Sequence, residues 1–372
     1  MRLVHLSQIK PGMVIARAIY GNKGQKLIND GAEIKDQFID YLRQLGISQV
    51  YVHDERVDDI HADDMVTDET RSQCRSAARE LLNKSGQNGA AGNNTIIEDR
   101  VGKSVDSLFE ELTQNPNTCV NLADIRSADS YTFEHCLNVT MLSIVTATKL
   151  KHPQALIKRI APGILLHDLG LTKVPEAILK KKGRLTDEEI GIIKKHPVFG
   201  YELFKETALF SENAGEIVYQ HHERIQGQGY PDGRSNDEIN WMAQIVAIAD
   251  TYDALTSYRP YRNSFRPREA IDIISREAGT AYNSEIVDAF LSFVSAYPLG
   301  SHVILSNGDG GIVVGNTAGH TYRPRVRVLF DPDNRPHRSP YEVDLQERDD
   351  LSVVKEIVTN QNGKKTFTQV AK

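Results

Sequence analysis

Cysteine is scarce in this sequence, with three residues in 372, at Cys74, Cys119 and Cys136. They form no Cys-x-x-Cys pair, and their odd number leaves one over. The sequence therefore supports neither a disulfide framework nor a zinc ribbon. Such sparse cysteine usage is typical of a cytoplasmic protein, and we expect that location.

Long apolar runs are also missing. Apolar stretches such as residues 245–249 fall far short of the about 18 residues that span a bilayer. Residues 1–10 lack the apolar core and the small-residue cleavage site of a signal peptide. We therefore expect no membrane insertion.

An excess of positive charge is absent as well. The chain has 44 Lys and Arg against 50 Asp and Glu, a net charge of −6. This balance argues against broad binding to a nucleic acid polymer, although it is compatible with a local basic pocket. Hydrophobic residues make up 40% and charged residues 25%, which is typical of a globular protein. The length of 372 residues predicts two or three domains.

The first segment, residues 1–64, is interpreted as a small α+β module. Short β-like runs surround one helical pattern there, and they predict strands at 14–20, 26–28 and 49–53 and a helix at 38–47. No catalytic grouping occurs in the module. A sensory or docking role with a signalling partner and a packing role in a homodimer are the alternatives for it.

The remaining chain divides into three further segments. Residues 65–127 predict a helical linker that contains a mobile Gly- and Asn-rich loop at 85–94 and a helix at 96–112. Residues 128–297 are almost wholly helical in pattern, and residues 298–372 form a β-rich extension with expected strands at 302–305, 311–314 and 325–330. The fold class that we expect is mainly α, with a small α+β module before the helices and a β appendage after them.

Histidines and carboxylates occur at conspicuous places in the helical segment. The pair His167-Asp168 ends an apolar helix expected over 155–169, and Asp250 is embedded in an apolar helix expected over 241–255. A carboxylate in an apolar helix is costly unless a partner or a metal neutralises it. Imidazole nitrogen and carboxylate oxygen suit transition metals. The sequence therefore predicts a metal site, for which the further candidates are His135, His196, His221 and His222.

These segments, in their order, resemble the HD-GYP family of cyclic dinucleotide phosphodiesterases. The resemblance covers residues 128–297 and is carried by a set of motifs, namely Tyr131-Thr-Phe-Glu-His135, Leu165-Leu-His-Asp-Leu-Gly170, His196-Pro-Val-Phe-Gly200, His221-His-Glu-Arg224, Gly229-Tyr-Pro231, Ile248-Ala-Asp-Thr-Tyr-Asp253 and Arg259-Pro-Tyr-Arg262. An isolated His-Asp pair would be weak, whereas the ordered set with Gly-Tyr-Pro is specific. The family's core is an all-helical bundle of the HD type, in agreement with the helical pattern.

The resemblance implies two divalent transition-metal ions per chain, with Fe, Mn, Co and Ni all compatible with the ligands. It assigns one ion to His135, His167, Asp168 and Asp250 and the other to His196, His221 and His222, with Asp168 bridging. Two such ions about 3.5–4 Å apart can supply a bridging hydroxide at neutral pH. The implied reaction is attack of that hydroxide on a phosphodiester, with His167 and Asp168 as the catalytic pair.

The resemblance also implies the groups that hold the substrate. Arg259 and Arg262 would clamp phosphate oxygens, and Gly229, Tyr230 and Pro231 would shape the wall of the pocket. The alternative for the two arginines is a structural pairing with an acidic residue such as Asp253, and the alternative for the tripeptide is an ordinary tight turn.

Three departures from the family pattern bear on metal number and substrate. Tyr131 stands where some members have a glutamate that binds a third metal, so two metals are expected. Leu171 replaces a lysine that contacts substrate phosphate; Lys173 could substitute for it or could be a solvated surface lysine. The stretch Gln226-Gly-Gln-Gly229 replaces Asp-Gly-x-Gly.

The expected function is hydrolysis of cyclic di-GMP to linear pGpG, with further hydrolysis to GMP left open. Two alternatives stay open. The substrate could be another cyclic dinucleotide such as 3'3'-cyclic GMP-AMP, or the protein could be a slow cyclic dinucleotide receptor. A nucleotide phosphohydrolase of the wider HD superfamily is disfavoured by Gly229-Tyr-Pro231.

Overall fold

The structure is a computed structural model of the chain. It describes residues 1–20, 26–44, 47, 49–60, 65–85, 94–114, 119, 131–181, 183–207, 211–257 and 264–357. The contacts divide the chain into two compact units. A helical unit comprises residues 65–116 and 131–290, and a second unit comprises residues 1–64, 117–130 and 291–372.

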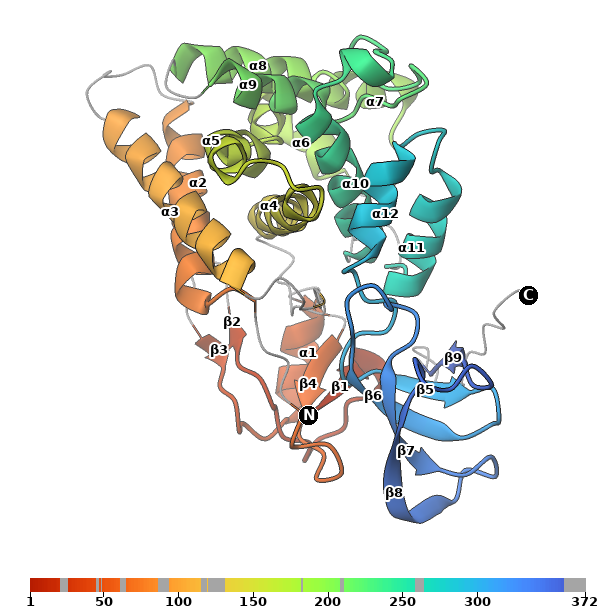
Figure 1. Cartoon of the computed structure of the whole chain (residues 1–372). Helices are drawn as coiled ribbons and strands as arrows, with labels where there is room; N and C mark the ends of the chain where they lie inside the picture. The colour runs from red at the N-terminus through yellow and green to blue at the C-terminus, as the bar shows by residue number, and fades with distance from the viewer. Residues whose placement is uncertain are drawn as a thin grey trace. The chain divides into compact units, whose positions relative to one another are not determined.

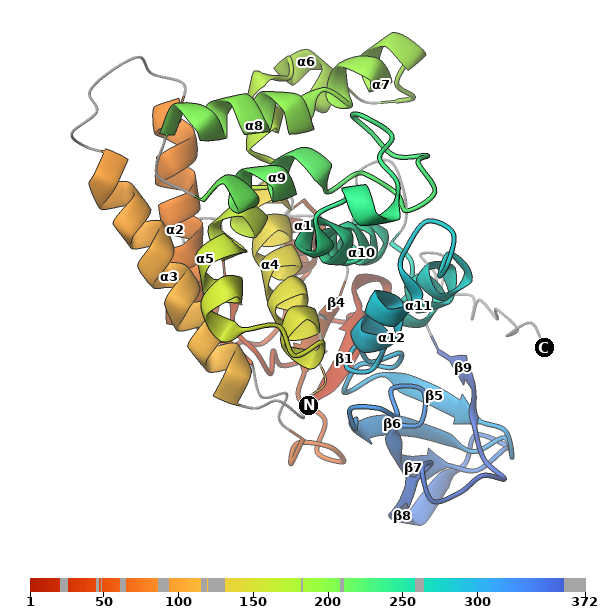
Figure 2. The same ribbon diagram turned by 45° about the horizontal axis from the view of Figure 1, so that its top comes forward.

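The helical unit is built around α4 (Tyr131–Lys149) and α10 (Trp241–Thr256), which pack against each other. Figures 1 and 2 both show α4 enclosed by its neighbours. Its other contacts are with α2 (Asp68–Ser85), α3 (Asn94–Gln114) and α5 (Gln154–Leu165). The unit is completed by η4 (Leu169–Lys173), α6 (Glu176–Leu179), α7 (Asp187–Ile193), α8 (His196–Thr207), α9 (Glu212–Gln220), η5 (Asn236–Glu238), α11 (Pro267–Arg276) and α12 (Ser284–Leu291).

Sequence patterns predicted most of these helices. Helix α10 is buried nearly all round, as its continuous apolar sequence indicates. Helix α7 begins with the capping box of Thr186 and Glu189, as expected from its sequence. The predicted helix over 155–169 is wrong at its end, because α5 stops at Leu165. The chain then turns through residues 166–168 into η4, so His167 and Asp168 lie in a turn between two helical elements.

The N-terminal part of the second unit is a small α+β fold. Strand β1 (Arg2–His5) pairs antiparallel with β4 (Gln49–Val52), and β2 (Ile19–Tyr20) pairs with β3 (Lys26–Ile28). Helix α1 (Asp36–Gln44) and the short η1 (Leu6–Gln8) complete it. The sequence did not predict β1, and the strand expected over 14–20 is reduced to β2 and two isolated bridges, at Val14 and Ile15.

The C-terminal part of this unit is an antiparallel sheet of five strands in the order β8-β7-β6-β5-β9. The strands β5 (His302–Leu305), β6 (Gly310–Gly315) and β7 (Arg325–Phe330) coincide with the three predicted ones, and β8 (Pro336–Asp344) and β9 (Val353–Glu356) are additional.

The N-terminal module and the C-terminal sheet share a core within this unit. Val57 and Ile60, which follow β4, pack against the sheet residues Ile312, Val314 and Leu329. Polar contacts join the same parts, because the Arg327 guanidinium donates to the Asp59 carboxylate at 2.7 and 2.6 Å and to the Arg56 carbonyl at 2.8 Å. The N-terminal module and the C-terminal sheet are therefore one compact body.

The expected fold class, mainly α with an α+β module and a β appendage, is confirmed. The domain limits at residues 64, 127 and 297 stay predictions. Helices α2 and α3, from the expected linker, pack against α4 and belong to the helical unit. Among the described residues, no helix combines the length and the apolar character needed to cross a membrane.

Candidate metal centre

The predicted metal ligands come from five places in the helical unit. His135 projects from the first turns of α4, and Asp250 from the middle of α10. His167 and Asp168 lie in the turn after α5. His196 is the first residue of α8, and His221 and His222 directly follow α9. Helices α4 and α10 thus supply one side of the centre, and the turns around α5, α8 and α9 supply the other.

Glycine allows the closest approach between these elements. A β-carbon on Gly170 of η4 would lie 1.9 Å from the carbonyl oxygen of His196 and 2.5 Å from the amide nitrogen of Gly200. Such distances leave no room for any side chain. Gly170 therefore lets η4 pack against the start of α8, which carries Asp168 toward His196.

Asp168 lies between two groups of imidazoles. Its Oδ1 is 3.3 Å from His196 Nε2 and 4.0 Å from His221 Nε2. Its Oδ2 is 3.7 Å from the Nε2 atoms of both His135 and His167. One carboxylate thus presents each of its oxygens to a different group, which is the arrangement that a ligand shared by two metal ions requires.

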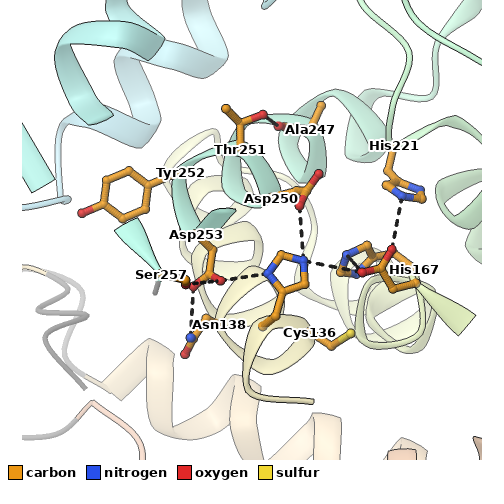
Figure 3. Close-up of polar contacts among 12 residues, drawn as sticks. Cys136, Asn138, His167, His221, Ala247, Asp250, Thr251, Tyr252, Asp253 and Ser257 are labelled. Carbon is orange, nitrogen blue, oxygen red and sulfur yellow. Dashed lines mark hydrogen bonds and ion pairs between the residues drawn. The ribbon is translucent and has the colours of Figure 1, made fainter. Parts of the chain in front are cut away.

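Asp250 faces the same space from α10. Its Oδ1 is 3.2 Å from His135 Nε2, and its Oδ2 is 3.7 Å from His222 Nδ1. Figure 3 shows Asp250 on its helix and His167 and His221 across the centre. The ligand atoms form two compact sets, each within 4.8 Å, namely His135, His167 and Asp250 in one and Asp168, His196, His221 and His222 in the other.

The hydrogen bonds behind three of the histidines fix their tautomers. His167, His196 and His221 each place Nδ1 2.8 Å from the backbone carbonyl oxygen three residues earlier, so Nδ1 carries the proton and donates. Their Nε2 lone pairs then point into the centre. The Nε2 atoms of His196 and His221 are 3.2 Å apart, and the buried Nε2 of His167 has no hydrogen-bond partner among the described residues. Converging lone pairs of this kind fit a bound cation.

Burial and neighbouring charges shift the pKa values of both carboxyls and of His222 toward their metal-binding protonation states. Burial raises the pKa of the Asp168 carboxyl, but the nearby imidazoles of His167 and His196 outweigh burial and hold that pKa well below its usual range. The same balance, through His135, lowers the pKa of Asp250. Burial lowers the pKa of His222 to about 3. The centre therefore offers anionic carboxylates beside a neutral His222 imidazole.

The pKa of His196 shifts in the other direction. Burial alone lowers it, but the hydrogen bond to the Asp168 carboxylate and the charge of that carboxylate raise it above its usual value.

Sequence patterns missed a carboxylate that supports this centre from behind. Asp253 is fully buried, and its Oδ2 accepts from His135 Nδ1 at 2.8 Å. Asn138 and Ser257 donate to the same carboxylate. Figure 3 shows Asp250 and Asp253 on α10 and Ser257 directly after the end of that helix. The Asp-x-x-Asp spacing, which puts both carboxylates on one helix face, was the available signal. Arg259 and Arg262 lie outside the described residues.

The Gly-Tyr-Pro segment lies against the histidines. The Tyr230 ring stacks on the His222 ring, with centroids 4.6 Å apart and an angle of 28°. A β-carbon on Gly229 would lie 2.3 Å from the Cα of Glu223, so only glycine fits there. Pro231 follows Tyr230 through a cis peptide bond. The segment is therefore packed directly on a predicted metal ligand.

Glu223 is a second residue whose role the sequence did not reveal. Its side chain is buried, and its carboxylate accepts from the backbone amides of Asp232, Gly233 and Arg234 at 2.8 to 3.2 Å. It thus holds the chain that follows Pro231 against the end of α9.

Two lysines are candidates for substrate contacts. The sequence predicts such a contact for Lys173, and the structure shows Lys194 near Tyr230. Lys173 is exposed at the end of η4, and no contact among the described residues joins it to the histidines. Lys194, just before α8, places its Nζ 5.3 Å from the centroid of the Tyr230 ring. Leu171, the substitute for the family lysine, is half-buried. Tyr131 is the first residue of α4.

Two parts of the sequence match models of known protein families. Residues 107–286 match the HD domain family, and residues 302–365 match the KOW domain associated with HD domains. The order of the two matches is that of an HD domain followed by its associated KOW domain, and His167-Asp168 lies inside the first match. With Gly229-Tyr-Pro231 beside the histidines, these matches and the relatives named below confirm the resemblance to the HD-GYP family.

Curated relatives share moderate sequence identity with the chain. A protein named cyclic di-GMP phosphodiesterase from Pseudomonas aeruginosa is 34% identical over 65% of this chain and 58% of its own length. One of the same name from Thermotoga maritima is 37% identical over 44% and 45%. A 3'3'-cGAMP-specific phosphodiesterase of Vibrio cholerae is 31% identical over 49% and 42%. The chain spans about half the length of these relatives.

A solved structure is also similar. An HDGYP protein from Bdellovibrio bacteriovorus is 17% identical, with a TM-score of 0.47 over 77% of this chain and 97% of that one.

Proposed function

We propose that this protein is a metal-dependent phosphodiesterase that hydrolyses cyclic di-GMP to linear pGpG. The observation that carries the proposal is the Asp168 carboxylate, whose two oxygens face separate groups of imidazoles at 3.3 to 4.0 Å. Relatives named cyclic di-GMP phosphodiesterases support the substrate class.

We assign two divalent ions to the centre, with Fe, Mn, Co and Ni as candidates. His135, His167 and Asp250 would hold one ion, His196, His221 and His222 the other, and Asp168 both. Two such ions, when bound, act as Lewis acids on phosphoryl oxygens and make water a nucleophile at neutral pH.

The chain's own residues would orient the substrate. Tyr230, held by its stacking on His222, offers a ring face against which a base can lie. Arg259, Arg262 and Lys194 supply cations for the phosphates. Lys194 and Lys173 are both exposed, and the Lys194 Nζ lies 5.3 Å from the centroid of the Tyr230 ring, which favours Lys194 for this role.

A related substrate is the second candidate, because the matched relatives include 3'3'-cGAMP-specific phosphodiesterases. Leu171 lacks the charge of the family lysine, so the phosphate contacts differ from the family pattern. A receptor that binds the nucleotide without cleaving it is the third candidate.

Product analysis on both cyclic dinucleotides, with protein of known metal content, separates these candidates. We expect linear pGpG from cyclic di-GMP, and preferential cleavage of cyclic GMP-AMP would replace the first substrate by the second. Tight binding of either nucleotide without product by protein that holds two ions would identify a receptor.

The variant Asp168→Ala tests the shared carboxylate. We expect it to abolish hydrolysis and to lower metal content from about two ions to at most one per chain. Asp288→Ala, the same change at an exposed position of α12, is the matched control and should retain both. Two ions and normal activity in Asp168→Ala would refute the binuclear assignment.

A further inference from the structure

The imidazoles of the metal centre are supported from behind in two different ways. His167, His196 and His221 each donate Nδ1–H to a backbone carbonyl oxygen at 2.8 Å. His135 instead donates to a carboxylate, Asp253 Oδ2, at 2.8 Å. A neutral carbonyl and an anion are not equivalent partners for an imidazole, so these four ligands differ in strength.

The Asp253 carboxylate is surrounded by hydrogen-bond donors. The side chain is fully buried, and donors reach both of its oxygens. Asn138 Nδ2 donates to Oδ1 at 3.1 Å, and Ser257 Oγ donates to Oδ2 at 3.0 Å, beside His135. Hydrogen bonds to the charged form stabilise a buried carboxylate as the anion.

An anion behind an imidazole raises the electron density at the far ring nitrogen and makes it a stronger metal ligand. For His135 that nitrogen is Nε2, which lies 3.2 Å from Asp250 and 3.7 Å from Asp168. We define the α4 half of the centre as His135, His167 and Asp250 with the shared Asp168. Three carboxylates, Asp253 included, thus act on a cation in the α4 half.

The other half has a smaller share of the charge of Asp250 and Asp253. We define the α9 half as His196, His221 and His222 with the shared Asp168. Asp250 reaches this half through Oδ2, 3.7 Å from His222 Nδ1, whereas its Oδ1 lies 3.2 Å from His135 Nε2 in the α4 half. In the α9 half, His196 and His221 are backed by neutral carbonyl groups. Coulomb attraction and ligand strength therefore both favour the α4 half for a divalent cation.

We propose that Asp253 is a positioning residue that makes the two halves unequal, so that the α4 half binds its ion tightly and the α9 half exchanges its ion. The inference rests on the two-ion centre of the proposed function, but it does not depend on the substrate. Since both ions are needed for the chemistry, occupancy of the α9 half makes the protein responsive to the ambient concentration of its metal.

Titration of the metal-free protein with Mn²⁺ tests this inequality directly, because free Mn²⁺ is counted by its electron paramagnetic resonance signal. We expect two binding steps in the wild type that differ at least tenfold in affinity. His196→Ala, which removes a ligand of the α9 half, should retain one tight ion, and His135→Ala should retain one weak ion. Two equal steps in the wild type, or the opposite order in the two variants, would overturn the inference.

Asp253→Asn tests the source of the inequality, because it removes the charge and conserves the shape. In the His196→Ala background it should weaken binding of the single remaining ion by roughly 10- to 100-fold. Ser257→Ala is the matched control, since it removes one hydrogen bond to the same oxygen and leaves the charge in place. It should weaken binding much less.

A purely structural role for Asp253 gives a different pattern. Asp253 joins α10 to His135 of α4, so a structural defect would lower the melting temperature of the metal-free protein and weaken both ions equally. Equal weakening of both steps by Asp253→Asn in the otherwise wild-type chain would overturn the inference. Unequal binding without any hydrolysis would refute the proposed function alone, and hydrolysis with equal binding would refute this inference alone.

Discussion

Gly170→Ala should disturb the metal centre without touching any ligand. The added β-carbon would lie 1.9 Å from the His196 carbonyl oxygen, whereas ordinary contact begins near 3.4 Å. Because the obstructing atoms belong to the backbone, no side-chain rotation relieves the clash, and η4 and α8 must separate by about 1.5 Å. The 3.3 Å contact between Asp168 and His196 would lengthen accordingly.

The energetic cost follows from the same geometry. Overpacking a tight interior costs about 1–3 kcal/mol, and a clash between backbone segments belongs at the upper end. A cost of about 3 kcal/mol lowers the melting temperature of a domain of this size by roughly 6–12 °C. We also expect the affinity for the ion of the α9 half to fall, because its shared carboxylate moves away from His196.

Scanning calorimetry of the metal-free protein and metal analysis after dialysis measure the two effects. Gly191→Ala is the matched control, because a β-carbon there meets nothing within 4 Å. Gly191 lies in α7, so this change should be neutral or stabilise the protein by up to about 1 kcal/mol. If Gly170→Ala melts like the wild type and retains two ions, the close packing of η4 on α8 does not position Asp168.

Two further predictions concern other parts of the chain. Lys194→Gln should raise KM for the cyclic dinucleotide about 10-fold, because it removes a charge-assisted phosphate contact, and it should retain both ions. Lys195→Gln, the same change one residue along, is the control and should leave KM unaltered. An equal effect of the two changes would argue for a diffuse charge effect. Truncation after residue 298 exposes Val57 and Ile60, so amide hydrogen exchange across β1 and β4 should accelerate. Unchanged protection of these amides would show that the N-terminal module folds without the C-terminal sheet.

The candidate ligands could be found from the sequence because each sits in a short local motif. His167-Asp168 and His221-His222 are adjacent pairs, and carboxylates in apolar helices such as Asp250 are conspicuous. The structure brings these residues together with the other candidates. Asp253 has the same local appearance as Asp250, but its partner depends on how α4 and α10 cross, which no local pattern encodes.

The strands show a similar limit. Strand β8 was not predicted because Pro336 and Pro340 interrupt it, and proline is tolerated there only because β8 is an edge strand. The end of α5 was misplaced because its apolar pattern continues to Leu169, although the helix stops at Leu165. In both cases the outcome depends on neighbours that are distant in sequence.

The core shared by the N-terminal module and the C-terminal sheet has a consequence for folding during synthesis on the ribosome. Arg327 lies 268 residues after its partner Asp59. At roughly 5–20 residues per second, translation takes about 13–54 seconds to cover that distance. During this interval Val57 and Ile60 lack the partners that bury them. The N-terminal module therefore exposes apolar surface while the helical unit is synthesised. We therefore expect chaperones to bind the nascent chain until the strands of the C-terminal sheet have been synthesised.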